Sequence, residues 1–321
     1  MHYRKFGRTG WQVSEMGYGM WGMAGWTGSD DEQSRHALAQ AVELGCNFFD
    51  TAWAYGEGRS EKLLGELVRN WPDKQLYTAT KIPPKNLKWP ARSDYKLEEV
   101  FPPGHIRKYT EVSLKNLGLE TVDLIQFHVW NDAWAEDERW QNAVSDLKRE
   151  GLIRAFGLSL NRWEPANGIR ALHTGLIDSV QVVYNIFDQA PEDELFPVCR
   201  ELDIAIIARV PFDEGTLTDT LTLDSKWPEG DFRNRYFTPE NLKASVQRAD
   251  ALRPIIPAGM SMPEMALRFI LSNPDVTTTI PGMRTVKNVD ANMAASQAGP
   301  LDPGLIGQLR RHRWDRPPYD E

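Results

Sequence analysis

Short apolar runs alternate with longer amphipathic stretches along most of the chain. Runs that are apolar on both faces and bounded by turn residues are typical of parallel strands, which helices cover on both sides of a sheet. We therefore predict buried strands over residues 16–20, 46–49, 76–80, 122–127, 154–158, 179–183, 204–208 and 276–280.

Helical patterns lie between these strands, and several carry recognisable end signals. Serine and aspartate side chains accept hydrogen bonds from the first backbone amides of a helix, and glycine commonly follows its last turn. The repeating unit is therefore a strand followed by a helix. The clearest helices are residues 32–44 after Ser29 or Asp30 and before Gly45, residues 61–69 after Ser60, and residues 140–150 before Gly151.

Eight such units within 321 residues match the size and rhythm of a closed barrel. We predict an α/β fold, a (β/α)8 TIM barrel, forming one domain over residues 1–321 because no break in composition interrupts the repeat. A β-hairpin is expected before it, with residues 3–6 and 12–14 flanking the turn Gly7-Arg8-Thr9-Gly10, and it is expected to close the bottom of the barrel.

Three connections are too long for simple turns. Residues 82–104, which include five prolines, 129–137 and 212–239 each follow the carboxyl end of a predicted strand. Long loops in compact domains are commonly binding loops or lids, so these three are expected to form the working face of the barrel.

The composition narrows the classes of partner. A net charge of -8 argues against general attraction to nucleic acid or to an anionic membrane. No apolar run approaches the ~18 residues of a membrane-spanning helix, and residues 1–10 lack the apolar core of a signal peptide, which favours a cytoplasmic protein. We expect a small-molecule substrate and a monomer or homo-oligomer.

The cysteine and histidine patterns indicate neither a disulfide framework nor a metal site. Cys46 and Cys199 each lie within an apolar stretch, which suits buried free thiols in a reducing compartment. The six histidines show no ligand spacing such as HxH or HExxH, so no metal is expected.

Four residues that carry chemistry fall at or near successive strand ends. Asp50, Tyr55, Lys81 and His128 are therefore expected to meet on the carboxyl face of the barrel, where barrel enzymes place their catalytic groups. Each alone has an ordinary structural explanation. Together they form a proton-transfer device, because a tyrosine needs a neighbouring cation such as Lys81 to act as an acid at neutral pH. Asp50 would keep that ammonium charged, and His128 would position a substrate oxygen.

Several stretches around these residues resemble motifs of the aldo-keto reductase family, in the same order and at similar spacing. The resemblance covers roughly residues 3–296, far more than a single short motif. The matching stretches are Tyr3-Arg4-Lys5-Phe6-Gly7-Arg8-Thr9-Gly10, Asp50-Thr51-Ala52-Trp53-Ala54-Tyr55-Gly56, Thr80-Lys81, Asp123-Leu124-Ile125-Gln126-Phe127-His128, Gly157-Leu158-Ser159, Gln181-Val182-Val183-Tyr184-Asn185 and Ile280-Pro281-Gly282-Met283-Arg284.

The resemblance implies an NADPH-dependent oxidoreductase that reduces an aldehyde or ketone, with NADH as a possible cofactor. Asp50, Tyr55, Lys81 and His128 would be its catalytic tetrad, and Tyr55 would donate the proton. The hydride chemistry belongs to the cofactor. A sugar or alcohol dehydrogenase that uses the same tetrad in the oxidising direction is an alternative. A third is a nicotinamide-sensing partner protein like the channel β subunits that share this fold.

By the same resemblance, Ser159, Asn161 and Gln181 would hold the nicotinamide carboxamide. Many members have serine followed directly by asparagine, whereas this chain has Ser159-Leu160-Asn161, so Asn161 can also be a simple turn residue. Arg209 stands where many relatives stack an aromatic ring on the nicotinamide, and a planar guanidinium can also stack.

The remaining cofactor contacts fall in two later segments. Backbone amides near the end of the seventh predicted strand would hold the pyrophosphate. Cations at the start of the helix over residues 285–296 would bind the 2'-phosphate of NADPH, and asparagines on that helix would face the adenine. The residues are Pro211, Phe212, Gly215 and Leu217 in the first segment, and Gly282, Arg284, Lys287, Asn288 and Asn292 in the second.

Residues 17–22 form a GxGxxG pattern after a predicted strand, which can indicate a different dinucleotide-binding fold. We reject that interpretation because residues 23–29 separate the last glycine from the next helix. As a barrel loop, Gly19, Met20 and Trp21 would line the cofactor channel. Trp21, Trp53 and Trp130 lie on loops of the working face and predict a broad aromatic substrate pocket.

Overall fold

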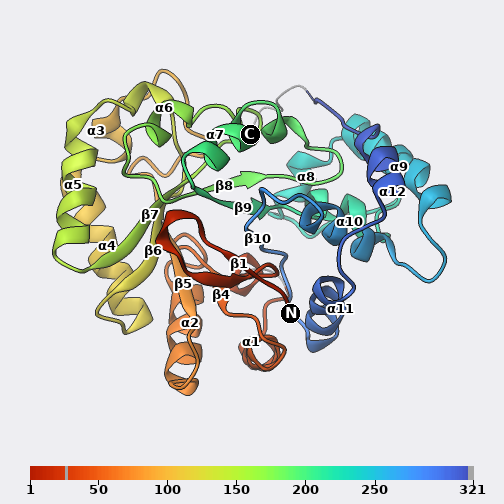
Figure 1. The fold of residues 1–321 in the computed structure, drawn as a ribbon, viewed down its shortest axis with the longest axis horizontal. Coiled ribbons are helices and arrows are strands. Elements are labelled where there is room, and N and C mark those ends of the chain that lie inside the picture. Colours follow the sequence, from red (N-terminus) through yellow and green to blue (C-terminus); the bar gives the residue numbers. More distant parts are fainter. Residues whose placement is uncertain (26–27, 317–321) are drawn as a thin grey trace.

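Each predicted apolar run contributes a strand, and the strands pair in the order in which they occur in the chain. The computed structural model describes residues 1–25 and 28–316. Neighbouring strands are parallel throughout the eight-stranded sheet (Figure 1). The strands are β3 (Tyr18–Gly19), β4 (Phe48–Asp50), β5 (Tyr77–Ile82), β6 (Val122–Phe127), β7 (Ile153–Ser159), β8 (Ser179–Val183), β9 (Ala205–Arg209) and β10 (Thr278–Thr279).

The first and last strands meet, so the sheet closes into a nearly complete barrel. The amide of Gly17 donates to the carbonyl oxygen of Thr279 over 2.8 Å, and Gly19 forms a parallel bridge with Gly282. A Cβ atom at Gly19 would lie 2.5 Å from the carbonyl oxygen of Ile280. Glycine is required there because the two strand ends approach too closely for a side chain. The predicted (β/α)8 barrel is therefore confirmed.

Helices surround the barrel, and their ends show where the predicted caps hold. Asp30, one of the two residues predicted to cap the first helix, accepts a hydrogen bond from the backbone amide of Gln33. The prediction that Ser60 caps the second helix is wrong. α2 begins at Arg59, and the Ser60 hydroxyl donates to the carbonyl oxygen of Met20. The helices are α1 (Asp31–Glu43), α2 (Arg59–Asn70), α3 (Leu97–Val100), α4 (Pro103–Leu117), α5 (Glu138–Arg149), α6 (Ile169–Leu172), α7 (Leu195–Glu201), α8 (Arg233–Tyr236), α9 (Pro239–Leu252), α10 (Met262–Leu271), α11 (Val286–Gln297) and α12 (Pro303–Arg310).

The three long connections contain short helices of their own. Residues 82–104 include α3, residues 129–137 include η3 (Asp132–Trp134), and residues 212–239 include η5 (Asp213–Thr218) and α8. All three extend from the carboxyl ends of strands, as predicted, because the parallel strands share one direction.

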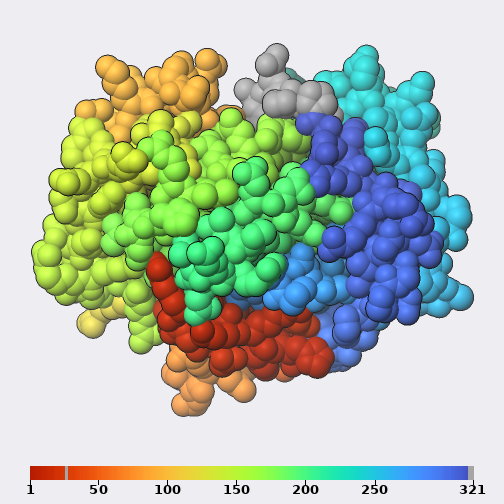
Figure 2. Space-filling view, turned by 45° about the horizontal axis from the view of Figure 1, so that its top comes forward, coloured from red at the N-terminus to blue at the C-terminus, as the bar shows by residue number. Residues whose placement is uncertain are grey.

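The predicted hairpin is present as β1 (Tyr3–Lys5) and β2 (Gln12–Ser14). It lies across the lower part of the face shown in Figure 2, in red. Phe6 and Val13 are fully buried in one cluster with interior barrel residues such as Ala79 and Ile207. The Phe6 ring stacks on Trp11 and on Phe48 at centroid distances of 5.6 and 5.4 Å. The hairpin therefore supplies the apolar floor of the barrel.

Within residues 1–25 and 28–316, no helix is long and apolar enough to cross a membrane. Cys46 and Cys199 are both buried and free. The same described residues contain no group of histidine, cysteine, aspartate and glutamate that could hold a metal ion.

We expect replacement of Phe6 to destabilise the barrel. Phe6→Ala removes a fully buried ring and leaves a cavity, which typically costs about 3–5 kcal/mol, and Phe6→Leu should cost less. Denaturant unfolding followed by tryptophan fluorescence measures both. Leu223→Ala is the control because Leu223 is 61% exposed. Equal unfolding midpoints for Phe6→Ala and Leu223→Ala would show that the hairpin is not part of the folded core.

Candidate active site

A buried ion pair forms the centre of the candidate active site. Asp50 is the last residue of β4, and Lys81 lies near the end of the neighbouring β5, both almost completely buried. The Lys81 Nζ lies 2.5 Å from the Asp50 Oδ1 and donates to the Thr51 carbonyl oxygen over 2.7 Å. Burial disfavours the ammonium, but the Asp50 carboxylate outweighs it and the pKa of Lys81 is raised. Lys81 is therefore positively charged at neutral pH.

Tyr55 lies on the loop between β4 and α2, with its hydroxyl beside this ammonium. Its Oη is 3.5 Å from the Lys81 Nζ, which also lies 5.0 Å from the centre of the Tyr55 ring. Burial raises the pKa of Tyr55 above its usual value, while the Lys81 charge acts in the lowering direction. The phenol is therefore protonated at neutral pH and has a cation in place to stabilise its phenolate.

His128 follows β6 directly and faces the same tyrosine. Its ring makes an edge contact with Tyr55 at 5.8 Å and another with Trp89 at 5.6 Å. Burial, followed by the charges of Lys81 and Arg209, lowers the pKa of His128 well below its usual range. Its Nδ1 is buried without a hydrogen-bond partner in residues 1–25 and 28–316. The site therefore contains a neutral imidazole with hydrogen-bonding capacity that the described residues leave unused.

Two glutamines hold the second carboxylate oxygen of Asp50. Gln126 and Gln181 both donate from Nε2 to the Asp50 Oδ2, over 3.1 and 2.8 Å. Sequence reasoning assigned no role to Gln126. It lies two residues before His128 on β6, and side chains two apart on a strand point to the same face, so the spacing could have indicated it.

The residues predicted to hold a carboxamide lie at the end of β7, in the middle of β8 and in the loop after β7. Ser159 is the last residue of β7 and is buried, and Gln181 lies opposite it on β8. Asn161 lies two residues after Ser159. Its side-chain amide donates to the carbonyl oxygen of Ala91 and to the Glu164 carboxylate, each over 3.0 Å. Asn161 therefore ties the long loop after β5 to the loop after β7.

Arg209 is the last residue of β9, and its charge acts on the buried Tyr55 and His128. One of its Nη atoms donates to the Leu160 carbonyl oxygen over 3.0 Å, and its charge contributes to lowering the pKa of His128.

The loop after β9 has a strained backbone, with positive φ angles at Val210, Asp213 and Glu214 of 56°, 45° and 56°. Pro211, Phe212, Gly215 and Leu217 all lie on this loop.

A third set of predicted residues lies where β10 leads into α11. Arg284, Lys287 and Asn288 are exposed, whereas Asn292 is buried, and Thr285 caps α11. The first turn of α11 contains no acidic residue. The Arg284 side chain lies against the loop after β3, since a Cβ at Gly22 would be 2.8 Å from its Cδ. The carboxyl end of the barrel thus carries two exposed cations beside the positive end of a twelve-residue helix.

The loop after β3 also lies next to this group. The Met20 amide donates to the Asp50 carbonyl oxygen over 2.9 Å, and Gly19 bridges to Gly282. Trp21 is 44% exposed and makes an edge contact with Phe232 at 5.3 Å. The loops after β3 and β9 therefore touch through these two rings.

The other predicted pocket tryptophans differ in accessibility. Trp53 is partly exposed and contacts Tyr109 at 4.9 Å. Trp130 is fully buried in an aromatic cluster with Phe127 and Trp140, so it offers no surface to a ligand. Trp89 is 38% exposed beside His128 and was not predicted. In the sequence, only its position in the long loop after β5 could have indicated that Trp89 lies near the site.

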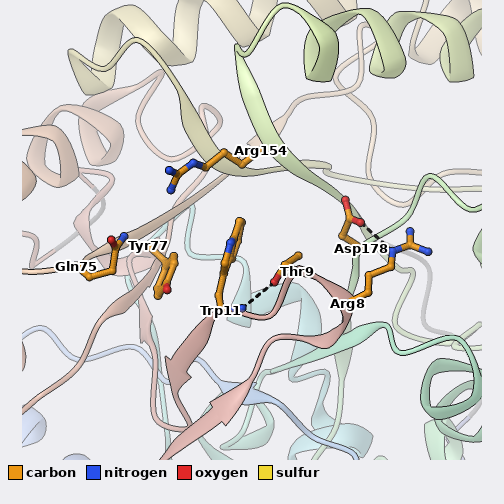
Figure 3. A pocket seen from close by; sticks show the side chains of 7 residues that line it. All are labelled: Arg8, Thr9, Trp11, Gln75, Tyr77, Arg154 and Asp178. Atoms are coloured by element: carbon orange, nitrogen blue, oxygen red, sulfur yellow. Dashed lines mark hydrogen bonds and ion pairs between the residues drawn. The ribbon is translucent and has the colours of Figure 1, made fainter.

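A surface hollow of about 470 Å³ lies at the opposite end of the barrel (Figure 3). Its residues include Trp11 of the hairpin loop, Tyr77 at the start of β5 and Asp178 just before β8. Because these are the amino-terminal ends of the strands, the hollow is separate from the Asp50–Lys81 pair.

A family model described as the aldo/keto reductase family matches residues 15–313. The chain is 30% identical over 306 residues to the NADH-specific methylglyoxal reductase of Escherichia coli (strain K12), with 90% of this chain and 91% of that protein covered. It is 30% identical over 292 residues to an aldo-keto reductase of Schizosaccharomyces pombe whose name specifies NADP(+), with 88% and 84% covered.

Solved structures show the same similarity. The holo form of the aldo-keto reductase AKR11C1 from Bacillus halodurans superposes with a TM-score of 0.77 at 25% identity, covering 98% of this chain and 97% of that one. The glycerol dehydrogenase AKR11B4 from Gluconobacter oxydans gives a TM-score of 0.77 at 25% identity, covering 96% and 94%.

We expect strong coupling between Asp50 and Lys81 in the stability of the fold. Lys81→Met leaves a buried carboxylate and Asp50→Asn leaves a buried ammonium, and each should cost about 3–5 kcal/mol. The double variant should cost clearly less than the sum. Denaturant unfolding of all four proteins measures the coupling. Arg92→Met, in an exposed pair with Asp94, is the control and should show no measurable change. Additive costs would show that the two charges do not depend on each other.

Proposed function

This chain belongs to the aldo/keto reductase family and is an NAD(P)H-dependent oxidoreductase, and we propose that it reduces a carbonyl substrate with Tyr55 as the proton donor. One observation carries this assignment. The Lys81 ammonium is bonded to Asp50 on one side and lies 3.5 Å from the Tyr55 hydroxyl on the other.

The protein's own contribution to the reaction is proton transfer. A bound nicotinamide cofactor supplies hydride to the carbonyl carbon. Tyr55 gives its proton to the carbonyl oxygen, and Lys81 stabilises the phenolate that forms. Asp50 keeps Lys81 charged, and Gln126 and Gln181 fix the carboxylate through its second oxygen.

His128 orients the substrate oxygen in this proposal. Because its pKa is lowered, the imidazole is neutral at neutral pH and offers one N–H donor and one acceptor. A neutral donor can hold a carbonyl oxygen without releasing its own proton, so the acid role falls to Tyr55. The Nδ1 of His128 has no hydrogen-bond partner among the described residues, which supports a ligand in this position.

The residues at the carboxyl end of the barrel fit a nicotinamide cofactor. Ser159, Asn161 and Gln181 are assigned to the carboxamide, and Arg209 to stacking on the nicotinamide. The segment that includes Pro211, Phe212, Gly215 and Leu217 is assigned to the pyrophosphate, and Gly19, Trp21 and Gly282 are assigned to the lining of the cofactor channel. Met20 was also predicted to line it, but Met20 is fully buried and is left out of the proposed channel.

We assign Arg284 and Lys287 to the 2'-phosphate, with Asn288 and Asn292 beside the adenine, so NADPH is the preferred cofactor. Both cations are exposed at the start of α11, and the first turn of this helix contains no acidic residue. The Arg284 charge also acts on Asp231. The two curated relatives differ in this property, one being named as NADH-specific and the other with NADP(+).

The substrate pocket is assigned to aromatic side chains on the loops at the carboxyl end of the barrel. Trp21 and Trp89 are both exposed by more than a third, and Trp53 is partly exposed. Flat aromatic surfaces pack against rings or the apolar faces of sugars. Trp130 is left out of the proposed pocket because it is fully buried.

A second candidate function is oxidation of an alcohol by the same residues. It is favoured by the similarity to a solved structure titled as a glycerol dehydrogenase. In that direction the Tyr55 phenolate would accept the proton, and Lys81 would stabilise the reactive form. Initial rates in both directions with one carbonyl and its alcohol, at neutral pH and matched cofactor concentrations, distinguish the two candidates.

We expect Tyr55→Phe to bind NADPH like the unaltered protein and to lose on the order of 10²-fold or more in turnover, because only the acid hydroxyl is removed. Tryptophan quenching gives the binding constant, and loss of nicotinamide absorbance with an aldehyde panel gives the rate. Tyr109→Phe is a matched control outside the ion pair. Unchanged turnover in Tyr55→Phe would exclude Tyr55 as the acid.

We expect Arg284→Ala to weaken NADPH binding by about tenfold, with a smaller effect on NADH, because a charge-assisted hydrogen bond contributes about 1.5–3 kcal/mol. Combining it with Lys287→Ala should weaken NADPH binding further. Titration of each protein with both nucleotides measures the ratio. Arg149→Ala, at an exposed site on α5, is the control. Equal loss for NADPH and NADH would contradict a role in binding the 2'-phosphate.

A further inference from the structure

A cluster of buried charges lies beside the segment assigned to the pyrophosphate. Its members come from loops after three successive strands, from α8 and from the segment after α12. We call it the Asp213 cluster. It consists of Arg162 after β7, Asp188 after β8, Asp213 and Glu214 in η5, Tyr236 in α8, and Arg316.

Arg316 is the most deeply buried cation of this cluster. Its side chain is 0% exposed, as is that of Asp213. Its Nη2 lies 2.8 Å from the Asp213 Oδ1 and 2.7 Å from the Asp188 Oδ2. Its Nη1 donates to the Tyr236 hydroxyl over 2.8 Å, and that hydroxyl donates to Asp213. Arg316 therefore joins the loops after β8 and β9 to α8.

Arg162 completes the cluster from the loop after β7. Its Nη2 lies 2.6 Å from the Asp213 Oδ1, and its Nη1 lies 3.0 Å from the Glu214 Oε1. Burial alone would raise the pKa of Asp213, but the charges of Arg316 and Arg162 outweigh burial and lower it. Asp213 is therefore an ionised carboxylate between two guanidiniums.

The backbone of this segment needs such support. Asp213 and Glu214 have φ angles of 45° and 56°, in the left-handed region that residues other than glycine rarely adopt. A conformation of this kind persists only where surrounding contacts fix it. The side chains of these same two residues are the ones that the guanidiniums hold.

The segment after α12 is itself anchored before it reaches Arg316. The Trp314 amide donates to the Phe187 carbonyl oxygen over 2.8 Å, and Arg313 pairs with Asp193 at 2.6 Å. The Arg316 guanidinium lies over the Trp314 ring at 4.4 Å. In Figure 2 this dark blue segment lies between green and cyan surfaces contributed by other parts of the chain.

We propose that Arg316 is a positioning residue for cofactor binding, which holds the segment Asp213–Thr218 in its strained conformation so that the segment can bind the pyrophosphate. This inference rests on the proposed function, because it needs the cofactor to occupy the loop after β9. Arg316 touches neither cofactor nor substrate, and acts through Asp213.

Loss of Arg316 should therefore weaken NADPH binding without slowing turnover. If loss of Arg316 leaves only a fraction of the molecules with a binding-competent segment, the apparent Kd rises by the inverse of that fraction. Once NADPH is bound, the segment is restored and the proton-transfer residues are unaffected. Affinity should therefore fall while kcat at saturating NADPH is retained.

The test measures the NADPH Kd by tryptophan quenching, kcat at saturating NADPH, and the thermal unfolding midpoint. Arg316→Met keeps the length of the side chain without its charge and should raise Kd on the order of tenfold, with kcat within about twofold of the unaltered protein. The Kd of Arg316→Lys should lie between those of Arg316→Met and the unaltered protein. Tyr236→Phe removes one hydroxyl from the cluster, should raise Kd less, and serves as the second variant if Arg316→Met does not fold.

Arg311→Met is the matched control, because Arg311 lies five residues earlier, is exposed and is not part of the Asp213 cluster. Its Kd should not change. A Kd within twofold of the unaltered protein in both Arg316→Met and Tyr236→Phe, or parallel losses of affinity and kcat, would overturn the inference and leave the proposed function intact. Failure of the unaltered protein to bind NADPH or NADH would overturn both.

Discussion

A buried ammonium and a buried carboxylate lie 2.5 Å apart at the carboxyl ends of two neighbouring strands, Lys81 on β5 and Asp50 on β4. Moving either charge from water into protein alone costs roughly several kcal/mol, so each is stable there because the other is present. The pair also satisfies the Thr51 carbonyl oxygen and binds two glutamines. The setting of Tyr55 follows from this pair, since the ammonium that lies beside its hydroxyl is fixed by Asp50.

Strand register explains how the barrel can hold charge above an apolar floor. Side chains two apart on a strand point the same way, so the interior residue above Ala79 is Lys81, and the one above Leu124 is Gln126. The lower interior layer packs on Phe6 and Val13 of the hairpin. One change from apolar to polar residues along β5 and β6 therefore separates the folded core from the reacting groups.

Much of this arrangement was predictable from the sequence, because it depends on local patterns. The apolar runs located the strands, and strand ends located Asp50, Lys81 and His128 on one face. The prediction that Ser60 caps α2 was wrong, because its hydroxyl bonds to Met20 and Thr51, which the chain brings close only when it folds. The burial of Trp130 depends likewise on Trp140 and Phe127, whose packing no loop pattern reveals.

The Asp213 cluster was the least predictable feature, since Arg316 and Asp213 are 103 residues apart and neither was assigned a role from the sequence. Its physical role follows from charge. A segment that carries Asp213 and Glu214 would repel the phosphates that it is proposed to bind, unless those carboxylates are neutralised. Arg162 and Arg316 offset two of the three carboxylate charges in the buried cluster, which belong to Asp188, Asp213 and Glu214, and burial raises the pKa of Glu214. An acidic protein can in this way offer phosphate-binding backbone amides on a segment with acidic side chains, while Arg284 and Lys287 supply the exposed positive charge.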